Sequence, residues 1–153
     1  ELPRRPRAET TMTTLDIVYE GGHRCRVRHL ASGAELLTDA PTDNGGCGLS
    51  FSPTDLLAAS FGTCLMTVLA LRFPEQENLL RRTRVQVIKK MRNEPVRCLA
   101  CLQVEVALPA EVPGHVRTSI EALAGCTPVG ASLADGVAIE LRVTTTVAAD
   151  GNA

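Results

Sequence analysis

The stretch Ser52–Met66, SPTDLLAASFGTCLM, decides the fold because it joins a helix start to a long apolar run. Ser52 is a good N-cap, and Pro53 suits the first helical position. Asp55 can reach back to the cap and favours the positive end of the helix dipole. The apolar pattern continues to about Arg72, just before a proline. The sequence therefore predicts a helix over residues 53–72, apolar on nearly every side and hence central to the fold.

Strand patterns surround this helix on both sides. Alternating or apolar segments are separated by turn residues, and Gly21-Gly22 indicates a hairpin turn between the first two strands. The order is three strands, a helix, two strands, a second helix and a last strand, which defines an α+β domain. The expected strands are residues 15–20, 24–30, 34–38, 83–91, 98–108 and 137–147, and the second helix is 115–124.

Length and composition restrict the function classes. With 153 residues we expect a single domain over residues 13–150, preceded by a disordered extension at 1–12. A net charge of -1 and an aromatic content of 3% argue against nucleic-acid binding. The longest apolar run is interrupted by polar residues, so no membrane span is expected. No hydrophobic segment follows the arginines of residues 1–11, so we expect a cytoplasmic location.

Two of the six cysteines, Cys64 and Cys126, are candidates for a redox-active pair. Cys64 lies about three turns into the predicted helix, beyond the reach of the N-terminal dipole, so a reactive thiolate there needs a cation from elsewhere. Arginine suits this task because it stays charged and offers several donors. Cys126 follows the second helix and could resolve an oxidised partner through a disulfide. From the residues alone, both cysteines fit equally a role as buried, unreactive thiols.

The other cysteines do not form a recognisable metal site. Cys98 and Cys101 make a C-x-x-C pair, but they start a strand pattern, where a spacing of three places side chains on opposite faces. No second C-x-x-C or spaced histidine pair accompanies them, and Cys25 and Cys47 lie in other segments. No nucleotide- or phosphate-binding motif is present. We therefore expect neither a metal nor an organic cofactor.

Two segments resemble the OsmC/Ohr family of thiol-dependent peroxidases, named for osmotically inducible protein C and organic hydroperoxide resistance protein. SPTDLLAASFGTC is similar to the family's Pro-x-Glu/Asp-Leu-Leu-x-Ala-x-x-x-x-Cys helix, and CTPVGASLADGVAIELRV is similar to its Cys-Pro-Val-x-x-Ser-Leu segment. This sequence has an additional Thr127 before Pro128. The resemblance covers residues 15–148 and is closest to an OsmC-like branch of the family.

The resemblance implies an OsmC-like α+β fold in which two long central helices are wrapped by antiparallel β-sheets in an intertwined homodimer. It also implies that Cys64 is the peroxidatic nucleophile and Cys126 the resolving thiol. An organic hydroperoxide would oxidise Cys64 to a sulfenic acid, a Cys64–Cys126 disulfide would follow, and an external dithiol reductant would restore both thiols. A peroxiredoxin-like role in the oxidative stress response is the corresponding expectation.

The sequence departs from the family at the helper carboxylate. Better characterised members use a glutamate ten residues before the cysteine to orient an arginine at the thiolate, and this position holds Thr54 here. Asp55 is the neighbouring candidate for that role, and Arg24 is the favoured candidate cation among Arg24, Arg26 and Arg28. The departure keeps two alternatives open: a non-catalytic dimer that binds a small molecule or lipid, and a redox sensor.

Overall fold

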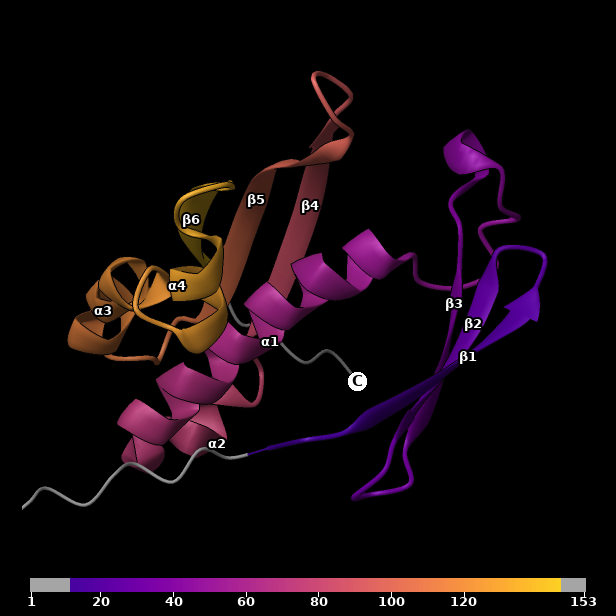
Figure 1. Ribbon diagram of the computed structural model, residues 1–153. Coiled ribbons are helices and arrows are strands. Elements are labelled where there is room, and N and C mark those ends of the chain that lie inside the picture. Colours follow the sequence, from indigo (N-terminus) through magenta and orange to yellow (C-terminus); the bar gives the residue numbers. More distant parts are fainter. Residues whose placement is uncertain (1–11, 147–153) are drawn as a thin grey trace, which may run out of the picture. The chain divides into compact units, whose positions relative to one another are not determined.

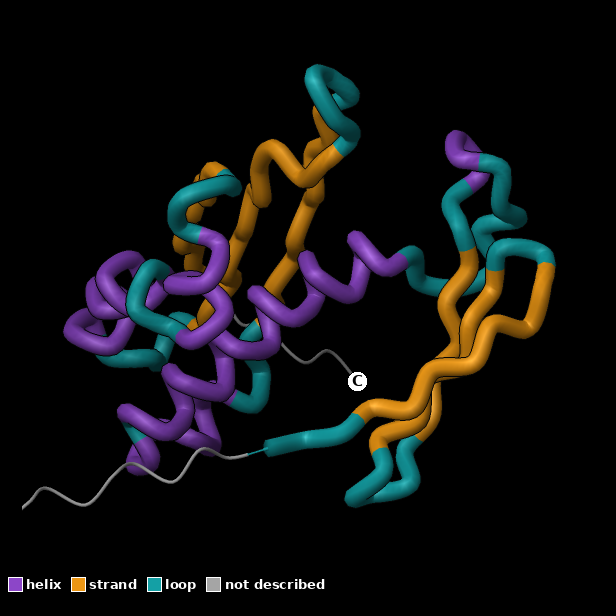
Figure 2. Tube along the Cα trace, in the orientation of Figure 1, coloured by secondary structure: helices purple, strands orange, loops and turns teal. Residues whose placement is uncertain are grey.

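The computed structural model describes residues 12–146, which form two compact units divided between Pro53 and Thr54. The predicted extension at residues 1–12 lies outside the described residues except for Met12. The secondary structure of both units is shown in Figures 1 and 2.

The first unit contains a three-stranded antiparallel sheet in the order β1–β2–β3. The predicted turn between β1 and β2 is confirmed, since Gly21 and Gly22 adopt φ values of 87° and 58°, which glycine reaches without steric strain. A short 3₁₀ helix and an irregular segment follow β3. The strands are β1 (Leu15–Gly21), β2 (Arg24–His29) and β3 (Glu35–Asp39), and the 3₁₀ helix is η1 (Thr42–Asn44).

This first unit has almost no core within itself. Of its described residues, only Thr38, Asp39 and Ser52 are buried. Apolar side chains of β1 remain exposed, among them Ile17 at 60% and Tyr19 at 65%. A sheet of three strands needs an apolar face packed against another layer to be stable. The β1–β2–β3 sheet therefore presents a face that requires a partner layer.

The second unit is an α+β layer structure built on the sheet β4–β5–β6. β4 and β5 pair antiparallel, whereas β5 and β6 pair parallel. The helices between β5 and β6 provide the crossover that a parallel pair needs. The elements are α1 (Pro53–Arg72), η2 (Pro74–Gln76), α2 (Glu77–Leu80), β4 (Arg84–Arg92), β5 (Cys98–Pro109), α3 (Gly114–Ala124), α4 (Pro128–Leu133) and β6 (Ala138–Thr146).

The hydrophobic core lies between α1, α3 and the inner face of this sheet. α1 contributes Phe61, Leu65 and Leu69, each fully buried, and β5 contributes the alternate residues from Leu102 to Leu108. Figure 1 shows α1 crossing β4 and β5 on the face that α3 also covers. The opposite face of the sheet has no helix over it within the described part of the chain and is called the outer face below.

The predicted elements are confirmed in order and type, and α1 has the predicted bounds. Two points need correction. The sheets are not wholly antiparallel, because β6 runs parallel to β5. Cys98 and Cys101 do not lie on opposite faces, because a bulge in β5 changes the alternation between them. The short helices α2 and α4 were not predicted, since four- and six-residue segments give no hydrophobic period to detect.

α1 is also long and apolar enough to cross a membrane, with a mean hydropathy of 1.6 over its most apolar window. The prediction that polar residues in this run exclude a membrane span is therefore not supported by its composition. The core helix of a folded protein passes the same test, and α1 supplies Phe61, Leu65 and Leu69 to the core of its unit. The prediction that the protein has no membrane partner stays a prediction.

Candidate active site

Cys64 lies at the edge of the buried face of α1. It follows Phe61 by three residues and precedes Leu65 by one, and both of these side chains are fully buried. At 100° of rotation per residue, Cys64 is turned well away from the sheet, and its side chain is half-buried. Leu57 and Leu71, seven residues before and after it, share this flank and are 39% and 76% exposed. The thiol therefore sits on an apolar flank of α1 that the second unit does not fully cover.

The roll of α1 is fixed by its closest contact with β4. Gly62 has no side chain, and a Cβ placed there would lie 3.0 Å from Val87 Cγ2 and 3.4 Å from Val85 Cγ1. These distances are at or below ordinary van der Waals contact, so the helix backbone lies directly against the strand. Because Cys64 is two residues beyond Gly62, or 200° around the helix, this contact directs the thiol away from β4.

Cys126 lies in the turn between α3 and α4. Its side chain is exposed, and its backbone N–H donates to the Leu123 carbonyl at 2.9 Å. Thr127, fully buried, is the N-cap of α4, and its Oγ1 accepts the Gly130 N–H at 3.0 Å. A Cβ at Gly130 would overlap the Ala124 carbonyl oxygen, so the turn admits only glycine there. The residue that the sequence adds to the family pattern thus organises the turn that carries Cys126.

The candidate carboxylate Asp55 is paired with a lysine. Lys89 Nζ lies 2.7 Å from Asp55 Oδ1 and donates to Thr54 Oγ1 at 2.7 Å. Lys89 comes from β4, whose inward positions otherwise hold Val85, Val87 and Met91. Sequence reasoning missed Lys89, although a lysine on the apolar side of an alternating strand signals a need for an anionic partner. The pair ties the first turn of α1 to the sheet.

Among the candidate arginines, only Arg24 differs in its surroundings. Within residues 12–146, Arg26 is bound to Glu20 and Glu35 at 2.7 and 3.3 Å, and Arg28 lies 3.9 Å from Glu35. The Glu20 hydrogen bond and charge raise the pKa of Arg26. Arg24 forms no such ion pair in the described part of the chain and is exposed at the start of β2. Its role at Cys64 stays a prediction.

Cys64 and Cys126 are both free thiols and lie in the same unit, and the remaining four cysteines are also free thiols. No group of three metal-ligating side chains gathers among the residues that the structure describes. Two hollows of about 330 and 470 Å³ lie along the sheet, and Cys64 and Cys126 line neither of them. The chemistry available on α1 and at the α3–α4 turn is therefore that of thiols.

Proteins similar to this chain are recognised by their three-dimensional structures. No protein-family model and no curated protein sequence matches the chain. A crystal structure from Psychrobacter arcticus 273-4, of a protein named for osmotic stress induction and a detoxification response, is 30% identical. It superimposes with a TM-score of 0.79, and the alignment covers 87% of this chain and 96% of that one.

More distant structures share the fold. An organic hydroperoxide resistance protein OsmC from Legionella pneumophila is 16% identical with a TM-score of 0.71, over 90% of this chain and 99% of that chain. The organic hydroperoxide resistance protein OhrB of Bacillus subtilis is 13% identical with a TM-score of 0.63, over 86% and 98%. The fold thus defines an OsmC-like α+β protein with a cysteine on its long helix. The chain belongs to the OsmC/Ohr family.

Proposed function

We propose that this protein is a thiol-dependent peroxidase that reduces organic hydroperoxides. The observation that carries the proposal is the half-buried Cys64 at the edge of α1 in a chain of the OsmC/Ohr family. Structural neighbours named as organic hydroperoxide resistance proteins support the peroxide class. The apolar side chains of Leu57 and Leu71, on the same flank of α1 as Cys64, favour a substrate with an organic group, since burial of that group adds affinity.

The proposed reaction oxidises the two protein thiols in two steps, and an external dithiol then reduces them. The Cys64 thiolate attacks the terminal oxygen of the hydroperoxide, an S–O bond forms, the O–O bond breaks, and the departing alkoxide takes a proton and leaves as an alcohol. The Cys126 thiol then attacks the Cys64 sulfenic acid, an S–S bond forms, and water leaves. An external dithiol reduces this disulfide by two exchange steps and becomes a disulfide itself. A dithiol supply agrees with the cytoplasmic location expected from the sequence.

The proposed assembly is a homodimer in which a second copy covers the exposed apolar surfaces. The β1–β2–β3 sheet buries almost nothing within its own unit, and the Leu57, Cys64 and Leu71 flank of α1 is incompletely covered by the second unit. Surfaces of this kind on a folded chain are typical of subunit interfaces. Sedimentation of the purified protein should give a dimer, and a stable monomer at micromolar concentration would contradict this assembly.

Arg24 is the proposed cation at the Cys64 thiolate. It is exposed, and the described residues provide it with no carboxylate partner, unlike Arg26 and Arg28. A guanidinium remains charged at every working pH and can donate to the sulfur. Arg24→Met should therefore lower the rate of peroxide reduction, while Arg28→Met provides a matched control on the same strand.

The central experiment follows the loss of cumene hydroperoxide in the presence of dithiothreitol. We expect Cys64→Ser to abolish turnover. In the absence of dithiothreitol, Cys126→Ser should complete one oxidation and then accumulate a sulfenic acid that a dimedone probe traps. Cys47→Ser, at an exposed cysteine of the first unit, is the matched control and should retain full activity. Undiminished turnover by Cys64→Ser would overturn the proposal.

A second candidate is a non-catalytic dimer that binds a lipid-like small molecule at the same flank. It is favoured by the engagement of Asp55 with Lys89, because this ion pair uses the carboxylate nearest the family's helper position. Native mass spectrometry of the purified dimer separates the two functions. A retained apolar ligand without peroxide turnover supports binding, and rapid turnover without a ligand rejects it.

A further inference from the structure

A second pair of cysteines shares the outer face of the sheet, away from Cys64. The register pairs Cys98 with Arg92 and Cys101 with Lys90, while Ala100 has no partner and forms a bulge. Arg92 and Lys90 are two residues apart on β4 and therefore point to the same face. Their partners Cys98 and Cys101 consequently share that face despite a sequence spacing of three.

The bulge makes the two thiols neighbours along one face of β5. Two strand residues correspond to a Cα separation of about 7 Å, just beyond the range of about 4.4–6.8 Å that disulfides span. An S–S bond between them therefore requires the strand to contract at the bulge. Exchange between the two sulfurs also depends on the charge and the exposure around each thiol.

Cys98 has a cation directly at its sulfur. Arg92 Nε donates to Cys98 Sγ at 2.8 Å, and the Cys98 side chain is half-buried at the start of β5. A thiolate accepts such a charge-assisted hydrogen bond better than a neutral thiol does. Cationic surroundings with partial exposure are the setting in which a cysteine attacks another sulfur. Cys98 is therefore the nucleophilic member of the pair.

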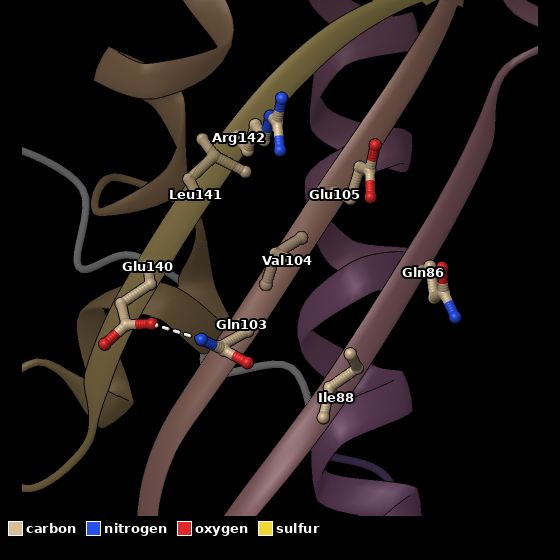
Figure 3. A pocket seen from close by; sticks show the side chains of 8 residues that line it. All are labelled: Gln86, Ile88, Gln103, Val104, Glu105, Glu140, Leu141 and Arg142. Atoms are coloured by element: carbon tan, nitrogen blue, oxygen red, sulfur yellow. Dashed lines mark hydrogen bonds between the residues drawn. The ribbon is translucent and has the colours of Figure 1, made fainter.

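Cys101 has the opposite surroundings. Its thiol is buried and hydrogen-bonds the Glu140 carboxylate, and burial, followed by the charge of Glu140, raises its pKa. Glu140 is itself held by Gln103 Nε2 at 2.7 Å, as Figure 3 shows, with Lys90 at 4.0 Å. Cys101 therefore keeps its proton until a neighbouring sulfur becomes electrophilic, which is the behaviour of a resolving thiol.

A place for a small molecule lies on the same face. Gln103 and Glu140 line a shallow hollow of about 330 Å³ that is also bordered by Ile88 and Arg142, all visible in Figure 3. Arg92 and Lys90 add positive charge on the Cys98 side of this face. The hollow itself carries the carboxylates of Glu105 and Glu140 beside Arg142, so the attraction for a low-molecular-weight disulfide with carboxylate groups comes from Arg92 and Lys90.

We propose that Cys98 and Cys101 form a second dithiol–disulfide couple, which exchanges with acidic low-molecular-weight disulfides and acts independently of Cys64 and Cys126. The Cys98 thiolate attacks the small disulfide, forming a mixed disulfide and releasing one thiolate. Cys101 then attacks Cys98 Sγ, the Cys98–Cys101 bond forms, and the second small thiol leaves with the Cys101 proton. The protein dithiol is oxidised by two electrons, and one disulfide is reduced to two thiols.

The test uses the reduced full-length protein with glutathione disulfide as the probe. Samples are blocked with iodoacetamide at timed intervals and digested with trypsin. Cleavage after Arg97 and Arg117 gives one peptide, residues 98–117, that contains Cys98 and Cys101 and no other cysteine. The expected result is paired loss of both alkylation sites from this peptide, with the mass of an internal disulfide, in wild type and in the Cys64→Ser, Cys126→Ser double variant alike.

Variants distinguish the two thiols. Cys101→Ser should stall with a glutathione adduct on Cys98, whereas Cys98→Ser should react slowly. Arg92→Met should slow the first step about tenfold, as expected for loss of one charge-assisted hydrogen bond at the nucleophile. Arg84→Met, an exposed arginine on the same side of β4, is the matched control and should react at the wild-type rate. Circular dichroism verifies that each variant is folded.

Two outcomes would overturn the proposal. One is a peptide 98–117 that stays doubly alkylated while the protein remains folded. The other is a Cys98→Ser variant that forms its glutathione adduct as fast as wild type does. Neither outcome bears on the peroxidase proposal, which is read from hydroperoxide loss and depends on Cys64.

Discussion

Lys89 and Asp55 form an ion pair of 2.7 Å that joins β4 to the first turn of α1. The same ammonium donates to Thr54, which occupies the position where the family's usual glutamate stands. The lysine is 22% exposed and the carboxylate 38%, so the pair is partly shielded from water. The helix that carries Cys64 is therefore anchored at its start by charge and in its middle by the Gly62 contact.

The Lys89–Asp55 pair should contribute a measurable coupling energy. Exposed pairs are typically worth about 0.2–1 kcal/mol, and the partial shielding here favours the upper part of that range. A double-mutant cycle with Lys89→Met and Asp55→Asn, followed by urea denaturation, isolates the coupling from each residue's other contacts. The Lys90–Glu140 pair, separated by 4.0 Å, is the comparison and should couple more weakly. A coupling indistinguishable from zero for Lys89 and Asp55 would contradict the anchoring role.

Gly62→Ala should destabilise the protein in spite of the better helix propensity of alanine. The propensity gain is about 1 kcal/mol, whereas forcing a methyl group against a β-branched strand residue costs about 1–3 kcal/mol. Val87 is stiff at χ1, so it cannot move its Cγ2 cheaply out of the 3.0 Å contact. Thermal unfolding should show the loss, and adding Val87→Ala should recover part of it. Stabilisation by Gly62→Ala alone would show that α1 can move away from β4.

Thr127→Val should weaken α4 and with it the turn that holds Cys126. Valine has the shape of threonine but leaves the Gly130 N–H without its capping acceptor, a loss of about 1–2 kcal/mol. Thr127→Ser retains the hydroxyl and is the matched control. Urea denaturation gives the stability difference, and equal stability of the two variants would show that the cap contributes nothing.

Stability should fall above the ordinary thiol pKa because of Cys101. Burial raises the pKa of Cys101 above its ordinary value of 9.0, with Glu140 as the next cause. Between these two pKa values the unfolded chain releases the thiol proton and the folded chain retains it, so the free energy of unfolding decreases as pH rises. Cys101→Ala should flatten this decrease in denaturation curves recorded from pH 8 upward. Glu140→Gln should reduce it only partly, since burial is the larger cause.

Much of the fold was predictable because its signals are local. The start of α1 at Ser52 and Pro53, its end near Arg72, and the Gly21-Gly22 turn depend on neighbouring residues alone, and all are confirmed. The parallel pairing of β6 was missed because strand direction is set by the crossover through α3 and α4, which no local pattern encodes.

The candidate site was predictable in part. Cys64 and Cys126 follow from the family motifs, but the partner of Asp55 is 34 residues away on β4, and only the folded chain shows that Lys89 reaches it. The family's glutamate-to-arginine arrangement indicates an arginine as the partner of the helper carboxylate. No local sequence pattern links Lys89, on the inner side of β4, to Asp55. The role of Thr127 was likewise invisible, because a cap has meaning only once α4 exists.

The bulge at Ala100 has a consequence for how this segment tolerates insertions and deletions. Deleting that one residue would leave a regular ladder with Cys98 still opposite Arg92, whereas inserting one more residue between the two cysteines without a second bulge would turn Cys98 into the apolar interior and away from Arg92. The chemistry of the C-x-x-C pair thus depends on the parity of residues in the strand rather than on the two cysteines themselves. Two homologous chains could keep both cysteines and still differ in whether the thiols face one another.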